Sequence, residues 1–184
     1  MSKKQRGLTI FLTGLSGAGK STIACELLAR LEEKGSRSVT LLDGDIVRKI
    51  LSSDLGYSRE HRDLNILRIG YVASEITKHG GIGICAVIAP YEATRQRVRE
   101  MVSKYGSFIE VYVATPLAEC EKRDPKGLYA KARAGEIHEF TGVSDPYEIP
   151  RESEILINTQ AMSVKESTDL IMKYLDQEGL LNGN

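Results

Sequence analysis

The sequence has no excess of charge of either sign. Its 184 residues include 25 lysines and arginines and 25 aspartates and glutamates, so the formal net charge at pH 7 is zero. A neutral chain gives no electrostatic reason to expect nucleic acid or an anionic membrane as its main partner. It also has no apolar run long enough to cross a bilayer. We therefore expect no nucleic-acid partner, no membrane association and a cytoplasmic location.

Cysteine and histidine are scarce as well. The three cysteines (Cys25, Cys85 and Cys120) and the three histidines are scattered, and none has the spacing of metal ligands. Cys25 and Cys85 fall within apolar patterns, which favours buried small side chains over a redox or zinc role. The composition, with 41% hydrophobic and 27% charged residues, is that of an ordinary globular domain.

Short apolar runs alternate with helical patterns along the chain. The apolar runs cover 8–13, 39–43, 82–88 and 108–114, with a weaker fifth at 153–158. Helical periodicity falls near 20–34, 45–52, 58–79, 91–105, 116–122 and 163–178. Such alternation predicts an α/β fold in three layers, with a central, mainly parallel five-stranded sheet. Residues 177–184 are expected to form a frayed tail.

Residues 123–150 interrupt this alternation. The segment contains three prolines, three glycines and many charges, but no strand pattern. A connection of this length is usually either a functional lid or disordered. Its helical piece at 128–134 and its aromatic residues argue against disorder, so we expect a mobile lid.

The segment GLSGAGKST, residues 14–22, follows the first expected strand and opens a helix. It fits the pattern G-x-x-x-x-G-K-[ST], whose glycines let backbone N–H groups surround a phosphate chain at a helix N-terminus. Lys20 is expected to reach the β- and γ-phosphates, and Ser21 to offer its hydroxyl to Mg²⁺. A guanine-specific N-K-x-D is missing at 158–161, which favours ATP. The expected ATP-binding residues of the loop are Gly14, Gly17, Ala18, Gly19, Lys20, Ser21 and Thr22.

Two carboxylates, Asp43 and Asp45, stand at the end of the second expected strand. Ligands of a parallel sheet bind at the carboxyl ends of its strands, so this pair is expected to face the phosphate site. There a carboxylate can orient or deprotonate an acceptor hydroxyl, or hold Mg²⁺ through water. A helix N-cap is the structural alternative. Arg48 lies one turn beyond Asp45, where a cation can meet an anionic acceptor.

The next helical pattern has a polar row. Arg59, Arg62 and Asn65 are three residues apart and share a face, and Arg68 extends the row. A solvated helix face is the usual interpretation of such a row. Here that interpretation competes with an anion site nearby.

The motifs resemble those of the adenylylsulfate kinases in content and in order. The matching pieces, spread over 6–178, are GLSGAGKST, DGDIVR, DLGYSREHRDLNILR, APYEATR and RDPKGLYAKARAGEIHEFTGVSDPYEIP. The resemblance implies a single P-loop kinase domain over 1–184 with a lid at about 123–150. It also implies transfer of the γ-phosphate of ATP to the ribose 3′-hydroxyl of adenosine 5′-phosphosulfate (APS). Mg²⁺ is the implied cofactor, and a homodimer and an association or fusion with ATP sulfurylase are the implied assemblies.

The resemblance also implies roles for individual residues. Asp45 would orient the 3′-hydroxyl or accept its proton, and Lys20 would neutralise charge during transfer. Phe140 would stack on the adenine of APS, with Arg62 on the other face. The adenine of ATP would lie near Arg123 and Met162. The implied substrate-binding residues are Asp43, Asp45, Arg48, Tyr57, Arg62, Asn65, Ile88, Ala89, Pro90, Lys126 and Phe140.

Two positions depart from the family pattern. Tyr57 stands where the family usually has phenylalanine, and Ala89 stands where many members have serine. Alanine has no nucleophile, so a covalent route through position 89 is excluded and direct in-line transfer is expected. The alternatives are a different small-molecule P-loop kinase and a non-catalytic nucleotide-binding module that regulates a sulfurylase. Retention of Lys20, Ser21 and both aspartates argues against the second.

Overall fold

The computed structural model describes residues 6–181. Its sheet has five strands: β1 (Gly7–Thr13), β2 (Val39–Asp43), β3 (Ile82–Ala86), β4 (Gly106–Val113) and β5 (Ile155–Ile157). They lie in the order β2-β3-β1-β4-β5, and every neighbouring pair is parallel. The predicted α/β fold is confirmed, with an all-parallel sheet instead of a mainly parallel one.

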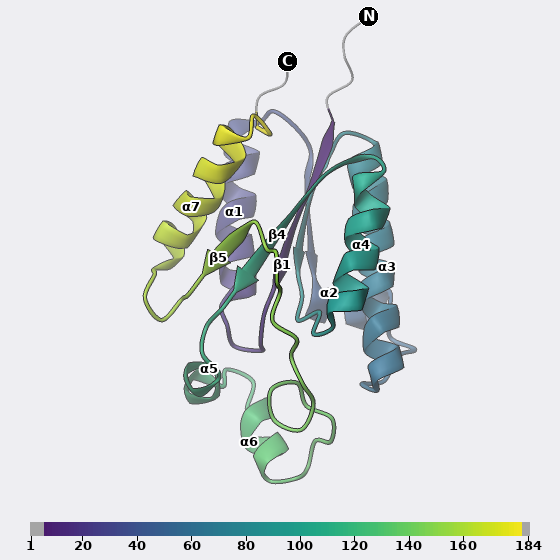
Figure 1. Ribbon diagram of the computed structural model, residues 1–184, viewed down its shortest axis with the longest axis vertical. Helices are drawn as coiled ribbons and strands as arrows, with labels where there is room; N and C mark the ends of the chain where they lie inside the picture. Colours follow the sequence, from purple (N-terminus) through teal and green to yellow (C-terminus); the bar gives the residue numbers. More distant parts are fainter. Residues whose placement is uncertain (1–5, 182–184) are drawn as a thin grey trace, which may run out of the picture.

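The helices within the described residues form two layers and a cap. They are α1 (Lys20–Lys34), α2 (Gly44–Ile50), α3 (Arg59–Lys78), α4 (Glu92–Ser103), α5 (Leu117–Arg123), α6 (Leu128–Arg133) and α7 (Val164–Gln177). Helices α1 and α7 cover one face of the sheet, and α3 and α4 cover the other (Figure 1). Helices α5 and α6 lie beyond the carboxyl ends of the strands (Figure 1). No helix within 6–181 is both long and apolar enough to cross a membrane.

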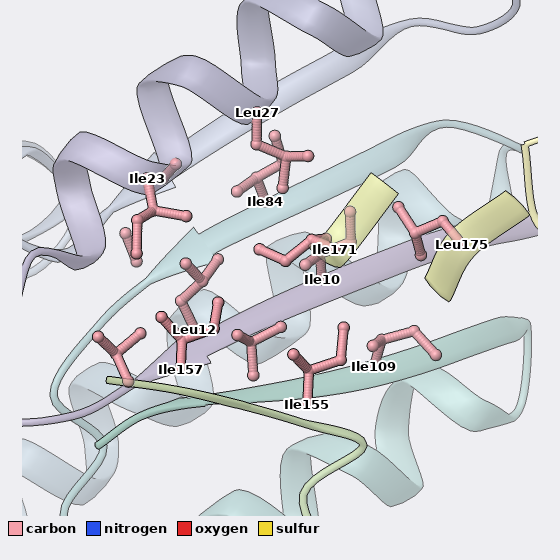
Figure 2. Packing of buried hydrophobic residues seen from close by; sticks show 14 of the residues in the cluster. Ile10, Leu12, Ile23, Leu27, Ile84, Ile109, Ile155, Ile157, Ile171 and Leu175 are labelled. Carbon is pink, nitrogen blue, oxygen red and sulfur yellow. The ribbon is translucent and has the colours of Figure 1, made fainter. Parts of the chain in front are cut away.

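The central strand β1 is buried on both faces. Successive side chains of a strand point to opposite sides. Leu8, Ile10 and Leu12 accordingly pack in one cluster with α1 and α7, whereas Phe11 packs in a second cluster with α3 and α4. Figure 2 shows the first cluster, in which side chains from the sheet meet those of both covering helices. Burial on both faces explains why β1 is a continuous apolar run in the sequence.

Several expectations about boundaries and burial are wrong. Cys25 is exposed, because its helical position turns it away from the inward-facing Ala24 and Leu27. The expected frayed tail packs back on the core up to Leu181, which is 4% exposed, while 182–184 lie outside the described residues. The third strand ends at Ala86, before the predicted end at 88, and the fifth covers only 155–157 of the predicted 153–158.

The chain turns sharply just after β3. Ala89 is buried and has a φ of 44°. A non-glycine residue in this region of φ costs about 1–3 kcal/mol and requires support from its surroundings. The support comes from Arg95 of α4, whose guanidinium donates to the carbonyl oxygen of Ala89 at 2.8 Å and to that of Glu148 at 2.7 Å.

Arg95 also forms a buried ion pair. Its Nε lies 3.0 Å from Oε1 of Glu110 on β4, and the side chains are 1% and 2% exposed. Burial raises the pKa of the Glu110 carboxyl, while the positive charge of Arg95 opposes that shift. Arg99 adds a second contact to Glu110 at 3.3 Å. Arg95 thus ties the loop after β3 and the chain before β5 to the sheet.

We expect Arg95→Met to lower the free energy of unfolding by about 3 kcal/mol, because it leaves the carboxylate of Glu110 buried with only the longer Arg99 contact. Denaturant unfolding measures this change. Arg97→Met, at an exposed position of the same helix, is the control and should stay within about 0.5 kcal/mol of the unsubstituted chain. Adding Glu110→Leu to Arg95→Met should restore only part of the loss, because the carbonyl oxygens of Ala89 and Glu148 still lack their donor. A loss below about 1 kcal/mol for Arg95→Met would contradict the ion-pair account.

Candidate active site

The glycine loop joins β1 to α1. Gly14 has a φ of 153°, and a Cβ added there would lie 2.5 Å from the carbonyl oxygen of Val113, so only glycine fits. Gly19 is the N-cap of α1 with a φ of 102°. No side chain of the described residues caps this helix. Its first N–H groups therefore point toward the loop with the positive end of the helix dipole, an arrangement that attracts phosphate.

Lys20 lies beneath this loop. Its side chain is buried, and Nζ donates to the carbonyl oxygens of Gly14 at 2.9 Å and Leu15 at 2.7 Å. Burial lowers the pKa of Lys20 to about 8. A polyphosphate bound in the loop would bring negative charge to the ammonium and raise its pKa again.

Asp43 joins the end of β2 to the glycine loop. Its Oδ2 accepts a hydrogen bond from Ser21 Oγ at 2.6 Å. Its Oδ1 accepts from the backbone N–H groups of Asp45 at 2.9 Å and Ile46 at 3.4 Å, so Asp43 is the N-cap of α2. The N-cap interpretation is therefore confirmed for Asp43, and the same carboxylate also holds the serine of the loop.

Ser21 and Asp43 fit a magnesium ion. Mg²⁺ prefers oxygen ligands and usually takes one or two from the protein and the rest from phosphates and water. The hydroxyl and carboxylate oxygens of these two residues are adjacent, 2.6 Å apart. Within residues 6–181 no cluster of three or more His, Cys, Asp or Glu side chains could hold a metal alone. The donor set thus suits an ion that arrives with a phosphate chain.

Asp45 forms an ion pair with Lys126 of the 123–150 segment. The side chains of Asp45 and Lys126 are 61% and 48% exposed. An ion pair this exposed contributes only about 0–1 kcal/mol to stability. The contact therefore places two charges at the mouth of the site without fixing the segment there.

The expected site residues surround a cavity of about 1020 Å³. It is lined by every expected substrate-binding residue: Asp43, Asp45, Arg48, Tyr57, Arg62, Asn65, Ile88, Ala89, Pro90, Lys126 and Phe140. On the loop side it is lined by Gly17, Gly19, Lys20, Ser21, Thr22 and Arg123. Gly14 and Ala18 lie behind this lining and shape the loop.

An adjoining hollow of about 270 Å³ contains the remaining expected residue, Met162. Gly19, Thr22 and Arg123 line both spaces. The structure therefore brings the residues expected for ATP and for the acceptor to one edge of the sheet, in two connected spaces.

The polar residues opposite the loop are held in place before any ligand contacts them. Arg48 donates to the carbonyl oxygen of Gly56 at 2.7 Å, and its guanidinium lies 4.5 Å from the ring centroid of Tyr57. Asn65 is 6% exposed, and its Oδ1 has no hydrogen-bond partner among the described residues. A buried oxygen without a partner in the wall of a cavity is a binding position for a donor group.

Two members of the predicted arginine row lie elsewhere. Arg68 pairs with Asp54 at 2.6 Å and does not line the cavity, so the solvated-face interpretation describes this member of the row. Arg59 lies over the ring of Tyr91, 4.3 Å from its centroid, also outside the cavity lining. Helical spacing puts Arg59 and Arg68 on the same helix face as Arg62. However, α3 is longer than the cavity wall, so these two residues lie beyond the wall on either side.

Sequence reasoning missed Thr159 at the end of β5. Its hydroxyl accepts from Arg123 at 2.7 Å and donates to the carbonyl oxygen of Ala18 at 2.8 Å, so it links Arg123 to the glycine loop. A signal for it existed, because Thr159 follows a strand whose carboxyl end lies at the same edge as the loop. Thr141 and Asp145, which hold Arg62, were also missed as individual residues, although both lie within the matching stretch at 123–150.

The class of the protein follows from the loop and its place in the fold. A glycine loop of this sequence directly after the central strand of a parallel α/β sheet, opening a helix with a buried lysine, defines a P-loop nucleotide-binding protein. The acidic strand end beside it is an arrangement found in P-loop enzymes that transfer phosphoryl groups.

Comparison with known proteins narrows the class to a family. A family model described as adenylylsulphate kinase matches residues 6–158. The chain belongs to this family. An adenylyl-sulfate kinase from Halothermothrix orenii is 50% identical over 98% of this chain and 95% of its own length.

Two further relatives extend the comparison. A sulfate adenylyltransferase from Phaeosphaeria nodorum is 51% identical over 97% of this chain, but the chain spans only 31% of that relative's length. The structure of the Mycobacterium tuberculosis APS kinase in complex with AMPPNP and APS superimposes with a TM-score of 0.89, at 39% identity, over 94% of this chain and 99% of that one.

The buried ammonium of Lys20 predicts a pH-dependent stability. Its folded pKa of about 8 lies below the ordinary value of 10.5, so the unfolded chain binds more protons between these values. The stability contributed by Lys20 is therefore lowest below this window and rises with pH through it. The free energy of unfolding, measured relative to Lys20→Met, should rise by about 2 kcal/mol between about pH 7 and about pH 9.5.

Urea unfolding at both pH values measures this difference. Lys34→Met, at an exposed position in the last turn of the same helix, is the control, and its difference from the unsubstituted chain should stay constant. A difference for Lys20→Met that does not change with pH would show that the ammonium is not desolvated by the loop.

Proposed function

We propose that this chain transfers the γ-phosphate of ATP to the ribose 3′-hydroxyl of APS, giving 3′-phosphoadenosine 5′-phosphosulfate and ADP. One observation carries the proposal: Asp45 and the P-loop Lys20 line the same cavity as Arg48, Arg62 and Asn65. A phosphate donor and an anionic acceptor can thus meet beside a carboxylate. Membership of the adenylylsulphate kinase family and the likeness to a structure that holds AMPPNP and APS support this choice of acceptor.

The chain's own groups hold the donor. The N–H groups of the loop and of the first turn of α1 bind the phosphates, and Lys20 neutralises their charge. Arg123 and Met162 border the adjoining hollow, where the adenine of ATP would lie. Mg²⁺, held by Ser21 and Asp43 together with the phosphates, would supply further positive charge against the charge that develops during transfer.

The acceptor is oriented from the opposite wall. Asp45 accepts a hydrogen bond from the 3′-hydroxyl and takes its proton while the oxygen attacks the γ-phosphorus in line with the departing ADP. Arg48 offers a cation to the phosphosulfate group, and Lys126 approaches the same region from the other side. Ala89 lines the cavity without a nucleophile, so the phosphoryl group passes directly from donor to acceptor.

The segment 123–150 completes the proposal as a lid. It contributes Lys126 and Phe140 to the cavity and lies over the ends of the strands. Closure of such a segment excludes water, which would otherwise compete with the acceptor for the phosphoryl group. An association with a sulfurylase is supported by the much longer sulfate adenylyltransferase relative. The homodimer and the cytoplasmic location stay predictions.

The proposal is tested by ADP release from ATP and Mg²⁺, with APS, AMP, gluconate and shikimate as separate acceptors. We expect turnover with APS alone. Asp45→Asn should lower kcat by about 10²–10⁴-fold, because it removes the proton acceptor while leaving the donor site intact. Asp176→Asn, at an exposed position on α7, is the matched control.

Other outcomes of this assay have distinct meanings. Turnover with gluconate or shikimate would move the assignment to a different small-molecule kinase. ATP binding without turnover of any acceptor would favour a non-catalytic nucleotide-binding module. Full activity of Asp45→Asn would remove Asp45 from the mechanism while leaving the substrate assignment unchanged.

Lys126 gives a second prediction. Because its ion pair with Asp45 is largely exposed, Lys126→Met should change the unfolding free energy by less than about 1 kcal/mol. The loss of a cation at the acceptor end should still raise KM for APS by about tenfold, equivalent to about 1.4 kcal/mol of binding. Steady-state kinetics and thermal unfolding measure the two effects. Lys131→Met, at an exposed position of α6, is the control, and equal KM values for the two variants would argue against a substrate contact by Lys126.

A further inference from the structure

Asp145 lies where three separate parts of the chain meet. Its Oδ2 accepts a hydrogen bond from Arg62 of α3 at 2.5 Å and another from the hydroxyl of Tyr91 at 2.6 Å. Tyr91 belongs to the loop after β3, and Asp145 itself belongs to the returning end of the 123–150 segment. Asp145 does not line the cavity, whereas Arg62 does. Any effect of Asp145 on a ligand must therefore act through another residue.

The backbone of Asp145 fixes the turn that carries Phe140. Its N–H donates to the carbonyl oxygen of Phe140 at 3.1 Å, and its carbonyl oxygen accepts from Gly142 N–H at 2.8 Å. Thr141, in the same turn, accepts from the guanidinium of Arg62 at 2.8 Å. The turn and the arginine are thus bonded to each other as well as to Asp145.

We propose that Asp145 is the positioning residue of an arginine–aromatic clamp, in which Arg62 and Phe140 hold the adenine ring of the nucleotide acceptor. The inference rests on the proposed function. Asp145 acts by holding both walls of the clamp at a fixed separation before the nucleotide enters.

The physical reason is the flexibility of arginine. A free arginine side chain loses rotamer freedom when a ligand orders it, and this loss weakens binding. Arg62 is already ordered by Asp145 and Thr141, and its side chain is 11% exposed, while that of Asp145 is 20% exposed. An ion pair with so little solvent around it is screened weakly, so the guanidinium plane stays in one orientation.

The ion pair with Asp145 also determines which surface of Arg62 can contact the ligand. Asp145 offsets the charge of Arg62, so the face of the guanidinium, which stacks well on an aromatic ring, becomes its main recognition surface. Arg48, by contrast, donates to backbone carbonyl oxygens, which are uncharged, and keeps its full charge for an anionic group. Burial raises the pKa of Tyr91 to about 12, with the hydrogen bond to Asp145 adding to the shift, so the hydroxyl remains a donor.

The first test is Asp145→Asn, which keeps the size of the side chain and removes its charge. We expect KM for APS to rise about tenfold while KM for ATP and kcat stay within about twofold, because only the acceptor clamp loosens. Asp145→Glu, which keeps the charge, should recover part of the loss. Asp169→Asn, which removes an aspartate paired with Arg30 on the α1–α7 face, is the matched control and should change neither KM.

A double variant separates positioning from a general structural role. If Asp145 acts through Arg62, adding Asp145→Asn to Arg62→Ala should raise KM for APS by less than about twofold beyond Arg62→Ala alone. A merely structural role would give effects that multiply. Multiplying effects, or an unchanged KM for APS in Asp145→Asn, would overturn the inference in an enzyme that uses APS.

The two proposals fail in distinguishable ways. Absence of APS turnover by the unsubstituted chain rejects the proposed function, and the positioning inference is then decided by hydrogen exchange of the protein without nucleotide. Amide hydrogens of 140–145 should exchange about tenfold faster in Asp145→Asn than in the unsubstituted chain, with no such change in Asp169→Asn. Equal exchange rates in Asp145→Asn and the unsubstituted chain would then reject the inference.

Discussion

The parallel direction of all five strands is the constraint on which the site depends. Because every carboxyl end opens at the same edge of the sheet, segments far apart in sequence reach one cavity. The glycine loop follows β1, Asp43 is the last residue of β2, and Ala89 follows β3. The connection after β4 brings Arg123, and the end of β5 brings Thr159. Each strand therefore contributes one part of the site. The covering helices hold the sheet in place and so fix the position of this edge.

Several groups at this edge serve structure and chemistry together. Asp43 caps α2 with one oxygen and holds Ser21 with the other, so the position of the candidate magnesium ligands is fixed by the start of a helix. Burial lowers the pKa of Lys20, because the ammonium that meets the phosphates is taken out of water before they bind. Arg95 maintains the unusual backbone of Ala89 in the cavity wall through a hydrogen bond from the core. The packing of the rest of the domain thus maintains a buried ammonium and a strained backbone that would be unfavourable in isolation.

The parts of this arrangement that local sequence determines were predictable. The strands buried on both faces, the glycine loop and the acidic end of β2 each follow from a short pattern whose physical meaning does not depend on distant residues. The pairing of Arg62 with Asp145 and of Arg68 with Asp54 was not predictable, because identical residues at helical spacing acquire different partners from the loops that pack against them. Cys25 shows the same limit, since one step around α1 changes a buried position into an exposed one.

Some parts of the 123–150 segment are bonded more firmly to the rest of the chain than others. The less firmly bonded part is the one that can move to open the cavity. At its returning end, Asp145 bonds Arg62, and the hydroxyl of Tyr147 lies 2.8 Å from that of Thr13. In its first half, the buried Tyr129 donates to the carbonyl oxygen of Ser16 at 2.9 Å. Between these anchors, residues 134–139 are mostly exposed, and the Lys126–Asp45 pair is largely open to solvent. Local opening starts where burial and bonding are weakest, so access to the cavity is expected through 134–139 and past Lys126, while the clamp residue Arg62 stays in place.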